Sequence, residues 1–551
     1  MTDERIRSLI IIFATVPFTG MTEFGPFTVG SIMINKKESQ ELLGKAALFE
    51  DTFSIDWLLE LTELKATKIL SILDQQTQNG ELIEKSSGLF SFSDDKQRRQ
   101  YFDRFDSQQK EQLHKRAIDI LTKEPLKEDD KTLFLARHRL QITNDIDGCY
   151  WLVRAGDMFA EQVKFSEAVE CYTKAITDLS RNHQQEADRL FIETVNKYMN
   201  MFSIRSESEW TMSILENALS RAATIKDQTF LCVLNLHMAI NQWQRTNSAK
   251  ALKHFQKGWS LAQQVEEPRL LKSIQTIGAY FYYLQGRFGD AIRTYEKSVQ
   301  NVENFPEDTS QLYAVAAIGR SYAAIGQPSQ GLGLLDAIRK HCLKIKQHQV
   351  AGWAVLQMAY ILKGIGRVED AYQLIAGLKS EAFNPSDIRY QEDLALLQAM
   401  LYYWKRDYEK SADHLRNYVQ IIKENEALGM PIASYGYVLK LCWEMERGNY
   451  PKIEDLKLEQ VIEHPIKSEH VFYKGYGYRY KALMARKRGA SSKEVLKNLK
   501  LSLRWLEESE HRLPIARTRV ELARHFMEQG DEENARKEAK EAANTLLSNR
   551  E

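Results

Sequence analysis

The sequence has little of what punctuates β-rich or disordered chains. Its 551 residues include only 11 prolines and 27 glycines, too few for an all-β fold with many turns or for long flexible linkers. A net charge is also missing, because 75 basic residues balance 75 acidic ones. No field of the whole chain would therefore draw in nucleic acid or an anionic membrane, and we expect no membrane partner.

Closely spaced cysteines are missing too. The chain has 5 cysteines and no Cys-x-x-Cys pair, which disfavours the paired spacings of a secreted protein. Isolated thiols within apolar helical stretches are typical of core residues in a reducing compartment. We therefore expect a cytoplasmic protein in which these residues are buried: Cys149, Cys171, Cys232, Cys342 and Cys442.

One apolar segment, Ser8–Ile34, has the outline of a signal peptide or membrane anchor and follows Arg5 and Arg7. Glu23, two prolines and three glycines interrupt it, and no Ala-x-Ala cleavage site is present. We interpret residues 1–35 as an apolar segment that contains a short β-strand or the remnant of a larger domain. Export or anchoring remains the alternative.

The chain is too long for one core, since single cores stop growing near about 250–300 residues, and its second part repeats. A small residue opens the second helix of each expected pair, in steps of 40, 40, 40 and 41 residues. Two antiparallel helices approach closely only where small residues line their crossing. The positions are Ala251, Ala291, Gly331, Ala371 and Ala412, and continuing the step leads to Ile453, Val495 and Ala535.

Glycine-centred turns recur between the expected helices. A helix commonly ends in a left-handed residue, which glycine adopts without strain. We therefore expect left-handed glycines between the helices of a pair, at Gly286, Gly326, Gly366, Gly448 and Gly530.

The small and aromatic slots, as in Gly156, Phe159, Ala168 and Tyr172, resemble the tetratricopeptide repeat, lengthened from 34 to about 40 residues. Such pairs are similar to those in the sensor region of maltose-regulator-type signal-transduction ATPases. The resemblance covers roughly residues 150–548. It implies an all-α fold, a tetratricopeptide-like α-solenoid over residues 124–551.

Residues 36–123 have a different organisation. Three short amphipathic helices, at 41–50, 55–61 and 67–78, precede a predicted hairpin of residues 81–85 and 89–93. This is the order of a winged helix, and a polar helix over Tyr101–Lys123 should follow. The stretch resembles the winged-helix segment of signal-transduction ATPases and tetratricopeptide-bearing transcription activators. In those, Leu89–Gln97 corresponds to the wing strand and following helix, and Leu113–Ala117 to a helix start.

Candidates for chemistry are weak. Gly25–Ile32 has the glycine spacing of a phosphate-binding loop, but Ser31 and Ile32 stand where Lys and a hydroxyl residue are required. His464 and His470 flank Pro465 in what we interpret as a solvent-facing loop, and no metal motif is present. We therefore expect no catalytic residues, no metal site and no cofactor, and the chain is not expected to be an enzyme.

Two stretches bear on nucleic acid. The expected recognition helix, residues 67–78, has polar Gln75 and Gln76 but little positive charge, and phosphate contacts supply much of the affinity for DNA. A basic run, Arg479–Arg504, is interpreted as a solvated helix face, with an acidic peptide or nucleic acid as the alternative partner.

Stacked helix pairs form a superhelix whose first helices line an inner groove. The equivalent positions of the first helices are Ala279, Gly319, Ala359 and Met400. The residue one position or one turn after each should project into the groove, and aromatic and Arg side chains are typical of binding hot spots. We predict a regulatory or scaffold protein in bacterial signalling or transcription control, with a protein segment or small effector in this groove. A DNA-binding regulator is the alternative. The predicted groove residues are Trp243, Tyr280, Tyr283, Arg320, Tyr360 and Trp404.

Overall fold

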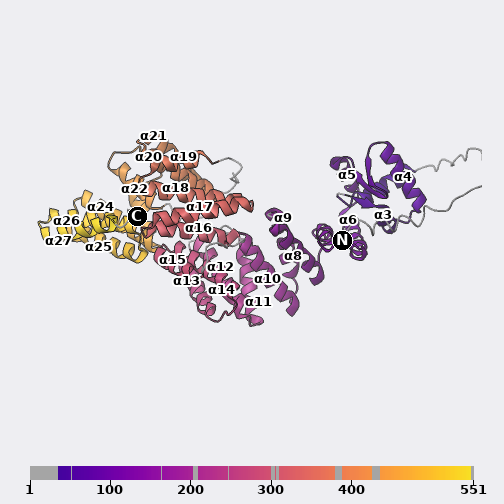
Figure 1. The fold of residues 1–551 in the computed structure, drawn as a ribbon, viewed down its shortest axis with the longest axis horizontal. Coiled ribbons are helices and arrows are strands. Elements are labelled where there is room, and N and C mark those ends of the chain that lie inside the picture. The colour runs from indigo at the N-terminus through magenta and orange to yellow at the C-terminus, as the bar shows by residue number, and fades with distance from the viewer. Residues whose placement is uncertain are drawn as a thin grey trace, which may run out of the picture. The chain divides into compact units, whose positions relative to one another are not determined.

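The computed structural model describes residues 35–50, 52–162, 164–202, 209–245, 247–298, 305, 309–378, 388–424 and 435–547. The chain divides into two compact units, one ending at Ile142 and one beginning at Thr143, and each is described by itself (Figure 1). The apolar segment Ser8–Ile34, with its glycine-spaced loop, lies outside the described residues. None of the described helices combines the length and the apolar character needed to cross a membrane.

The first unit combines short helices with a three-stranded antiparallel sheet of order β1-β3-β2. Strands β2 and β3 form the predicted hairpin, with Leu82 opposite Phe92. Strand β1 completes the sheet, with the rings of Phe53 and Phe90 stacked at 6.1 Å. The elements are α2 (Lys36–Ala46), β1 (Phe53–Ser54), α3 (Ile55–Leu61), α4 (Ala66–Gln78), β2 (Leu82–Ser86), β3 (Leu89–Phe92), α5 (Asp95–Phe102), α6 (Ser107–Lys123) and α7 (Glu128–Arg139).

The single polar helix predicted over Tyr101–Lys123 is wrong. The chain forms two helices there, α5 and α6, because Asp106 starts a new helix. Its side chain accepts a hydrogen bond from the backbone of Gln109, whose side chain accepts one from the backbone of Asp106. This reciprocal pair satisfies two N–H groups that a helix start leaves without partners. Leu113–Ala117 therefore lies inside α6 and does not start a helix.

The division between the units falls after α7, whereas the sequence placed it at 123/124. Helix α7 belongs to the first unit because its apolar side packs there. The ring of Phe134 meets Trp57 edge-on at 6.3 Å. His138 contacts His114 of α6, with 3.0 Å between their Nδ1 atoms.

The second unit is a succession of helices that pair in chain order, the all-α, tetratricopeptide-like solenoid (Figure 1). The pairs are α8 (Ile146–Glu161) with α9 (Phe165–Leu179), α10 (Gln185–Phe202) with α11 (Glu209–Thr224), α12 (Gln228–Gln244) with α13 (Ser248–Ala262), α14 (Pro268–Leu284) with α15 (Phe288–Ser298), α16 (Thr309–Ala324) with α17 (Pro328–Lys344), α18 (His348–Gly364) with α19 (Val368–Ala376), α20 (Ile388–Trp404) with α21 (Tyr408–Glu424), α22 (Tyr435–Glu446) with α23 (Leu458–Lys467), α24 (Val471–Lys487) with α25 (Ser492–Ser509), and α26 (Arg512–Glu528) with α27 (Glu532–Leu547).

The predicted small slots lie at the crossings within these pairs. Ala251, Ala291, Ala371 and Ala412 are fully buried. A Cβ placed on Gly331 of α17 would overlap the backbone oxygen of Gly319 on α16, so only glycine permits this approach.

The expected helix start at Ile453 is wrong. The chain is irregular from Pro451 until α23 begins at Leu458. The forty-residue step is therefore interrupted at this pair.

The predicted left-handed glycines are confirmed. Gly286, Gly326, Gly366, Gly448 and Gly530 all have φ between 75° and 94°. In the turn between α20 and α21 no glycine is available, and Arg406 adopts φ 62° in its place.

The turn between α14 and α15 contacts helices that lie about two hundred residues further along the chain. The backbone N–H of Val471 donates to the carbonyl of Gln285 at 3.1 Å. Phe288 meets the rings of Phe472 and His511 edge-on, both at 5.5 Å. We call this set of contacts the closure; it folds the solenoid back on itself within the second unit.

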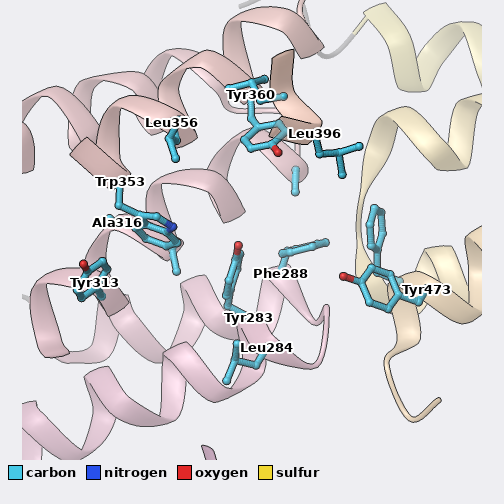
Figure 2. Packing of buried hydrophobic residues seen from close by; sticks show 14 of the residues in the cluster. Tyr283, Leu284, Phe288, Tyr313, Ala316, Trp353, Leu356, Tyr360, Leu396 and Tyr473 are labelled. Carbon is cyan, nitrogen blue, oxygen red and sulfur yellow. The ribbon is translucent and has the colours of Figure 1, made fainter. Parts of the chain in front are cut away.

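Two ion pairs border the closure. Arg287 pairs with Glu508, and Arg293 pairs with Glu510 at 2.8 Å. Figure 2 shows the adjoining core, where Phe288 lies between Tyr283 of α14 and Tyr473 of α24. The closure thus joins an apolar centre to a charged border.

Candidate functional site

A cavity of about 450 Å³ lies within the second unit. Most of its wall comes from the first helices of successive pairs, α14 to α26, with the closure residues Phe288, Phe472 and His511 and single residues of the second helices α17, α19 and α27. Pockets that hold small molecules have volumes of roughly 300–1,000 Å³. The cavity therefore has the size of a small-ligand site.

One position of each first helix supplies a row of wall residues. From α14 to α22 the row consists of Tyr283, Ala323, Lys363, Trp404 and Lys440, all of which line the cavity. Steps of 40, 40, 41 and 36 residues separate them. We call this set the wall row. The repeat thus brings residues far apart in sequence onto one surface.

Four of the six predicted groove residues line the cavity: Tyr283, Arg320, Tyr360 and Trp404. The structure places the other two beside it. Trp243 is buried against Phe281, with ring centroids 5.5 Å apart. Tyr280 stacks on Tyr283 at 6.0 Å. Both are packing residues behind the wall.

The charged side chains on the wall are all basic. Arg320, Lys363, Lys440 and Arg517 line the cavity from α16, α18, α22 and α26, and no carboxylate is among the described lining residues. Burial, reinforced by the other three cations, lowers the pKa of Lys363 well below its usual range. Burial and Arg517 lower the pKa of Lys440 as well. Like charges gathered in a poorly solvated space destabilise the empty site.

Tyrosine rings lie against these cations. Tyr360 and Tyr437 stack with centroids 5.6 Å apart and planes 5° apart. The Lys363 ammonium lies 3.3 Å from the Tyr437 centroid, and Arg320 lies 4.4 Å from that of Tyr360. Such contacts offset part of the cost of burying a cation. Burial raises the pKa of Tyr283 and of Tyr437, so both hydroxyls stay protonated and can donate hydrogen bonds.

Two histidines support the wall, His470 from the core and the half-buried His511 at the cavity surface. Burial, with Arg320, Arg517 and Lys363 nearby, lowers the pKa of His511 to about 3. Burial also lowers the pKa of His470 to about 3, and its Nδ1 accepts a hydrogen bond from the backbone of Tyr473 at 3.2 Å. The predicted solvent-facing position of His470 is therefore wrong. Pro465 lies within helix α23, and His470 caps the next helix from inside the core.

The two lysines and Arg517 were not predicted from the sequence. A signal for part of this set does exist, because a tyrosine is followed three positions later by a cation in three first helices. The pairs are Tyr360 with Lys363, Tyr437 with Lys440 and Tyr476 with Arg479. Residues three apart share a helix face, so each pair faces the same side. Arg517 follows no such tyrosine.

Three consecutive cations of the basic run Arg479–Arg504 form ion pairs. Arg486 pairs with Glu521, Lys487 with Glu446 and Arg488 with Glu459. These carboxylates lie on neighbouring helix pairs, so the charges link adjacent repeats. Within the described part of the chain, no cluster of three His, Cys, Asp or Glu side chains could hold a metal.

No family model and no curated protein matches the sequence. Among solved structures, similar ones include a signal-transduction ATPase with a tetratricopeptide repeat sensor from Pyrococcus horikoshii, with 13% identity and a TM-score of 0.37. The match covers 86% of this chain, which spans 64% of the length of that protein.

Two further structures are similar. They are a Rap protein complexed with competence and sporulation factor (11% identity, TM-score 0.42, 73% of this chain and 98% of that one) and the apo quorum sensor NprR from B. thuringiensis (12%, 0.41, 64% and 98%). Likenesses this distant do not decide the function. The fold and the cavity by themselves define the class: a helical-repeat protein with a cation-lined internal cavity.

Proposed function

We propose that the chain is a non-catalytic regulatory protein of the cytoplasm, which binds an effector in the cavity of the second unit and presents its state to a protein partner. The observation that supports this is the wall row, which brings two aromatic residues and two lysines to about 450 Å³ of space. The contacts of the closure border the cavity through Phe288, Phe472 and His511. A bordered space of this size suits a small effector better than a protein segment.

Obstruction of the cavity tests the proposal. Gly364 lines the cavity, and a Cβ placed there meets no atom within 4 Å. Gly364→Phe should therefore fill the space without disturbing the fold. Gly333→Phe is the matched control, because Gly333 is also an open helical glycine but lies outside the cavity.

Both variants and the unaltered protein are incubated with a small-molecule extract of the source cells and measured by native mass spectrometry. We expect the unaltered protein and Gly333→Phe to retain the same added mass, and Gly364→Phe to lose it. Retention by all three proteins, or by none, would refute effector binding in the cavity.

A DNA-binding regulator is the second candidate, favoured by the element order of the first unit. We propose that α2, β1, α3, α4, β2 and β3 constitute a winged helix, with α4 as its recognition helix. The charge on α4 supports a packing role instead, because Lys68 is paired with Glu38 at 2.5 Å and Asp74 is exposed. Gel-shift titration with genomic fragments should show no salt-resistant specific complex. Such a complex would favour the DNA-binding function.

A further inference from the structure

Three cations of the cavity wall, Lys363, Lys440 and Arg517, have a different environment from the paired buried charges elsewhere in this protein. Arg221, for example, is buried together with Asp188 at 2.8 Å. Lys363, Lys440 and Arg517 have no carboxylate within ion-pair distance among the described residues. Buried charges are usually paired because desolvation is costly. Lys363 is buried, and Lys440 and Arg517 are half-buried. Three cations of this kind around one cavity indicate a ligand that supplies the negative charge.

The amount of charge indicates the kind of anion. A single carboxylate would neutralise one of the cations, whereas a phosphate or a chain of phosphates neutralises several at one place. Arginine presents a planar fork that matches phosphate oxygens, and lysine is a compact charge that phosphates also use. Arg517 and the two lysines together have the donor chemistry of a phosphate site.

The same wall offers a surface for a flat ring. Trp404 lines the cavity beside Lys440, whose ammonium lies 5.4 Å from the indole centroid. Its side chain is 44% exposed, unlike Tyr360, which is buried and stacks on the half-buried Tyr437. An exposed indole next to a cation can stack on a nucleobase, since every base has a π-face.

We propose that the effector is a nucleoside phosphate, with its phosphates at Lys363, Lys440 and Arg517 and its base against Trp404. This deepens the proposed function and rests on it. An acidic peptide is less suitable, because its carboxylates are spread along an extended chain whereas these cations surround one small cavity.

Isothermal titration calorimetry of the full chain tests the proposal. The probes are the four ribonucleoside triphosphates and monophosphates, adenosine, pyrophosphate and a short polyglutamate peptide. We expect at least one nucleotide to bind, pyrophosphate to bind more weakly and adenosine not to bind. Absence of binding by every nucleotide at millimolar concentration would overturn the proposal, as would tighter binding of polyglutamate or of adenosine.

Three variants locate the ligand. Lys363→Met should weaken nucleotide binding at least tenfold, and Lys440→Met repeats the test from another helix. Lys481→Met is the control, because Lys481 is exposed on α24 and outside the cavity, and its affinity should stay within twofold. Trp404→Leu should weaken nucleotide binding and leave pyrophosphate binding unchanged. Equal affinities for all variants would place the nucleotide elsewhere.

A failure of the nucleotide proposal can be distinguished from a failure of the proposed function. If the mass retained from cell extract disappears in Gly364→Phe while no nucleotide binds, the cavity is an effector site for another class of ligand. If neither experiment shows binding, both proposals fall.

Discussion

The helix crossings and the cavity wall are built from the same helix pairs of the second unit, yet their residues obey opposite rules. At the crossings, Ala291 and Ala371 are small, apolar and fully buried. On the wall, Lys363 and Trp404 are large, and one is charged without a carboxylate partner among the described residues. Packing explains the crossings completely. Packing does not account for the desolvated charge of Lys363, and we propose that such a residue is kept for binding.

The largest effect is expected when the same substitution is made at a helix crossing and on the cavity wall. Ala291→Trp should destabilise the second unit by about 3 kcal/mol or more, because a crossing with no free volume must be forced apart. Ala323→Trp, on the wall row, should cost about 1 kcal/mol or less because the indole can extend into the cavity. Urea unfolding of the two variants measures the difference. Equal losses would mean that the crossing and the wall are not distinct.

The closure can be tested at one turn. Gly286 has φ 75°, and a Cβ there would overlap the His470 ring, whereas a Cβ on Gly366, at φ 88°, meets nothing within 4 Å. Gly366→Ala should cost about 1–2 kcal/mol from left-handed strain alone. Gly286→Ala should cost about 1–3 kcal/mol more, from the overlap. Thermal unfolding that shifts equally in both variants would contradict the contact.

Lowering the pH should reduce the stability that the cavity wall contributes. It should not affect the helix crossings, whose small residues do not titrate. The pKa of His511 falls to about 3 in the folded protein, against an unfolded value near 6.5. The neutral form is the folded form, so its stabilising contribution is complete above pH 6.5 and is lost as the pH falls toward 3.

For His511 the loss between pH 7 and pH 5 should be about 2 kcal/mol, with a similar loss for His470. Urea unfolding at the two pH values checks this. In His511→Gln the difference in unfolding free energy between pH 7 and pH 5 should be smaller by the contribution of His511, about 2 kcal/mol. An unchanged difference would show that His511 is not buried in the neutral form.

A change of opposite sign is expected for the wall cation. Lys363→Met keeps an unbranched apolar chain and removes a desolvated charge, so the ligand-free protein should become more stable by about 1 kcal/mol. Lys481→Met, at an exposed position on α24, should change stability by less than about 0.5 kcal/mol. Chemical unfolding without ligand gives both values. A loss of stability in Lys363→Met would mean that the lysine holds the wall together.

The smallest effect concerns the basic run outside the cavity. Lys487→Ala removes an exposed ion pair with Glu446, and such pairs contribute about 0–1 kcal/mol. We expect a barely measurable change in the urea midpoint, reduced further by added salt. A loss above about 2 kcal/mol would show that charge, rather than the crossings, joins these repeats.

The helices and turns that follow from local sequence were predictable. The contacts between helices far apart in the sequence, which form the closure, were not. Each helix crossing requires a small residue, and the crossings recur about every forty positions. Small residues at this spacing, such as Ala251, Ala291 and Gly331, therefore predict them. The turns likewise follow from glycines such as Gly286. The break at Asp106 was missed because a capping box competes with the helical pattern around it.

The candidate site was predictable only in part. Tyr283, Arg320, Tyr360 and Trp404 were found because the repeat fixes which positions face inward. Trp243 and Tyr280 occupy comparable positions but are covered by Phe281 and Tyr283, and periodicity does not show which inward residue another one covers. Arg517 reaches the wall because the closure joins segments about two hundred residues apart. A local sequence pattern does not show which distant segments will meet.

In most stacked-repeat proteins each unit touches only its neighbours, so the array frays from either end and its parts melt in sequence. The hydrogen bond from Val471 to Gln285 and the pair of Arg293 with Glu510 join α14–α15 to α24–α26. The repeats between α14 and α26 are therefore held at both ends, and none of them can open without disrupting these two contacts. Hydrogen exchange should therefore show one shared opening rate from α14 to α26.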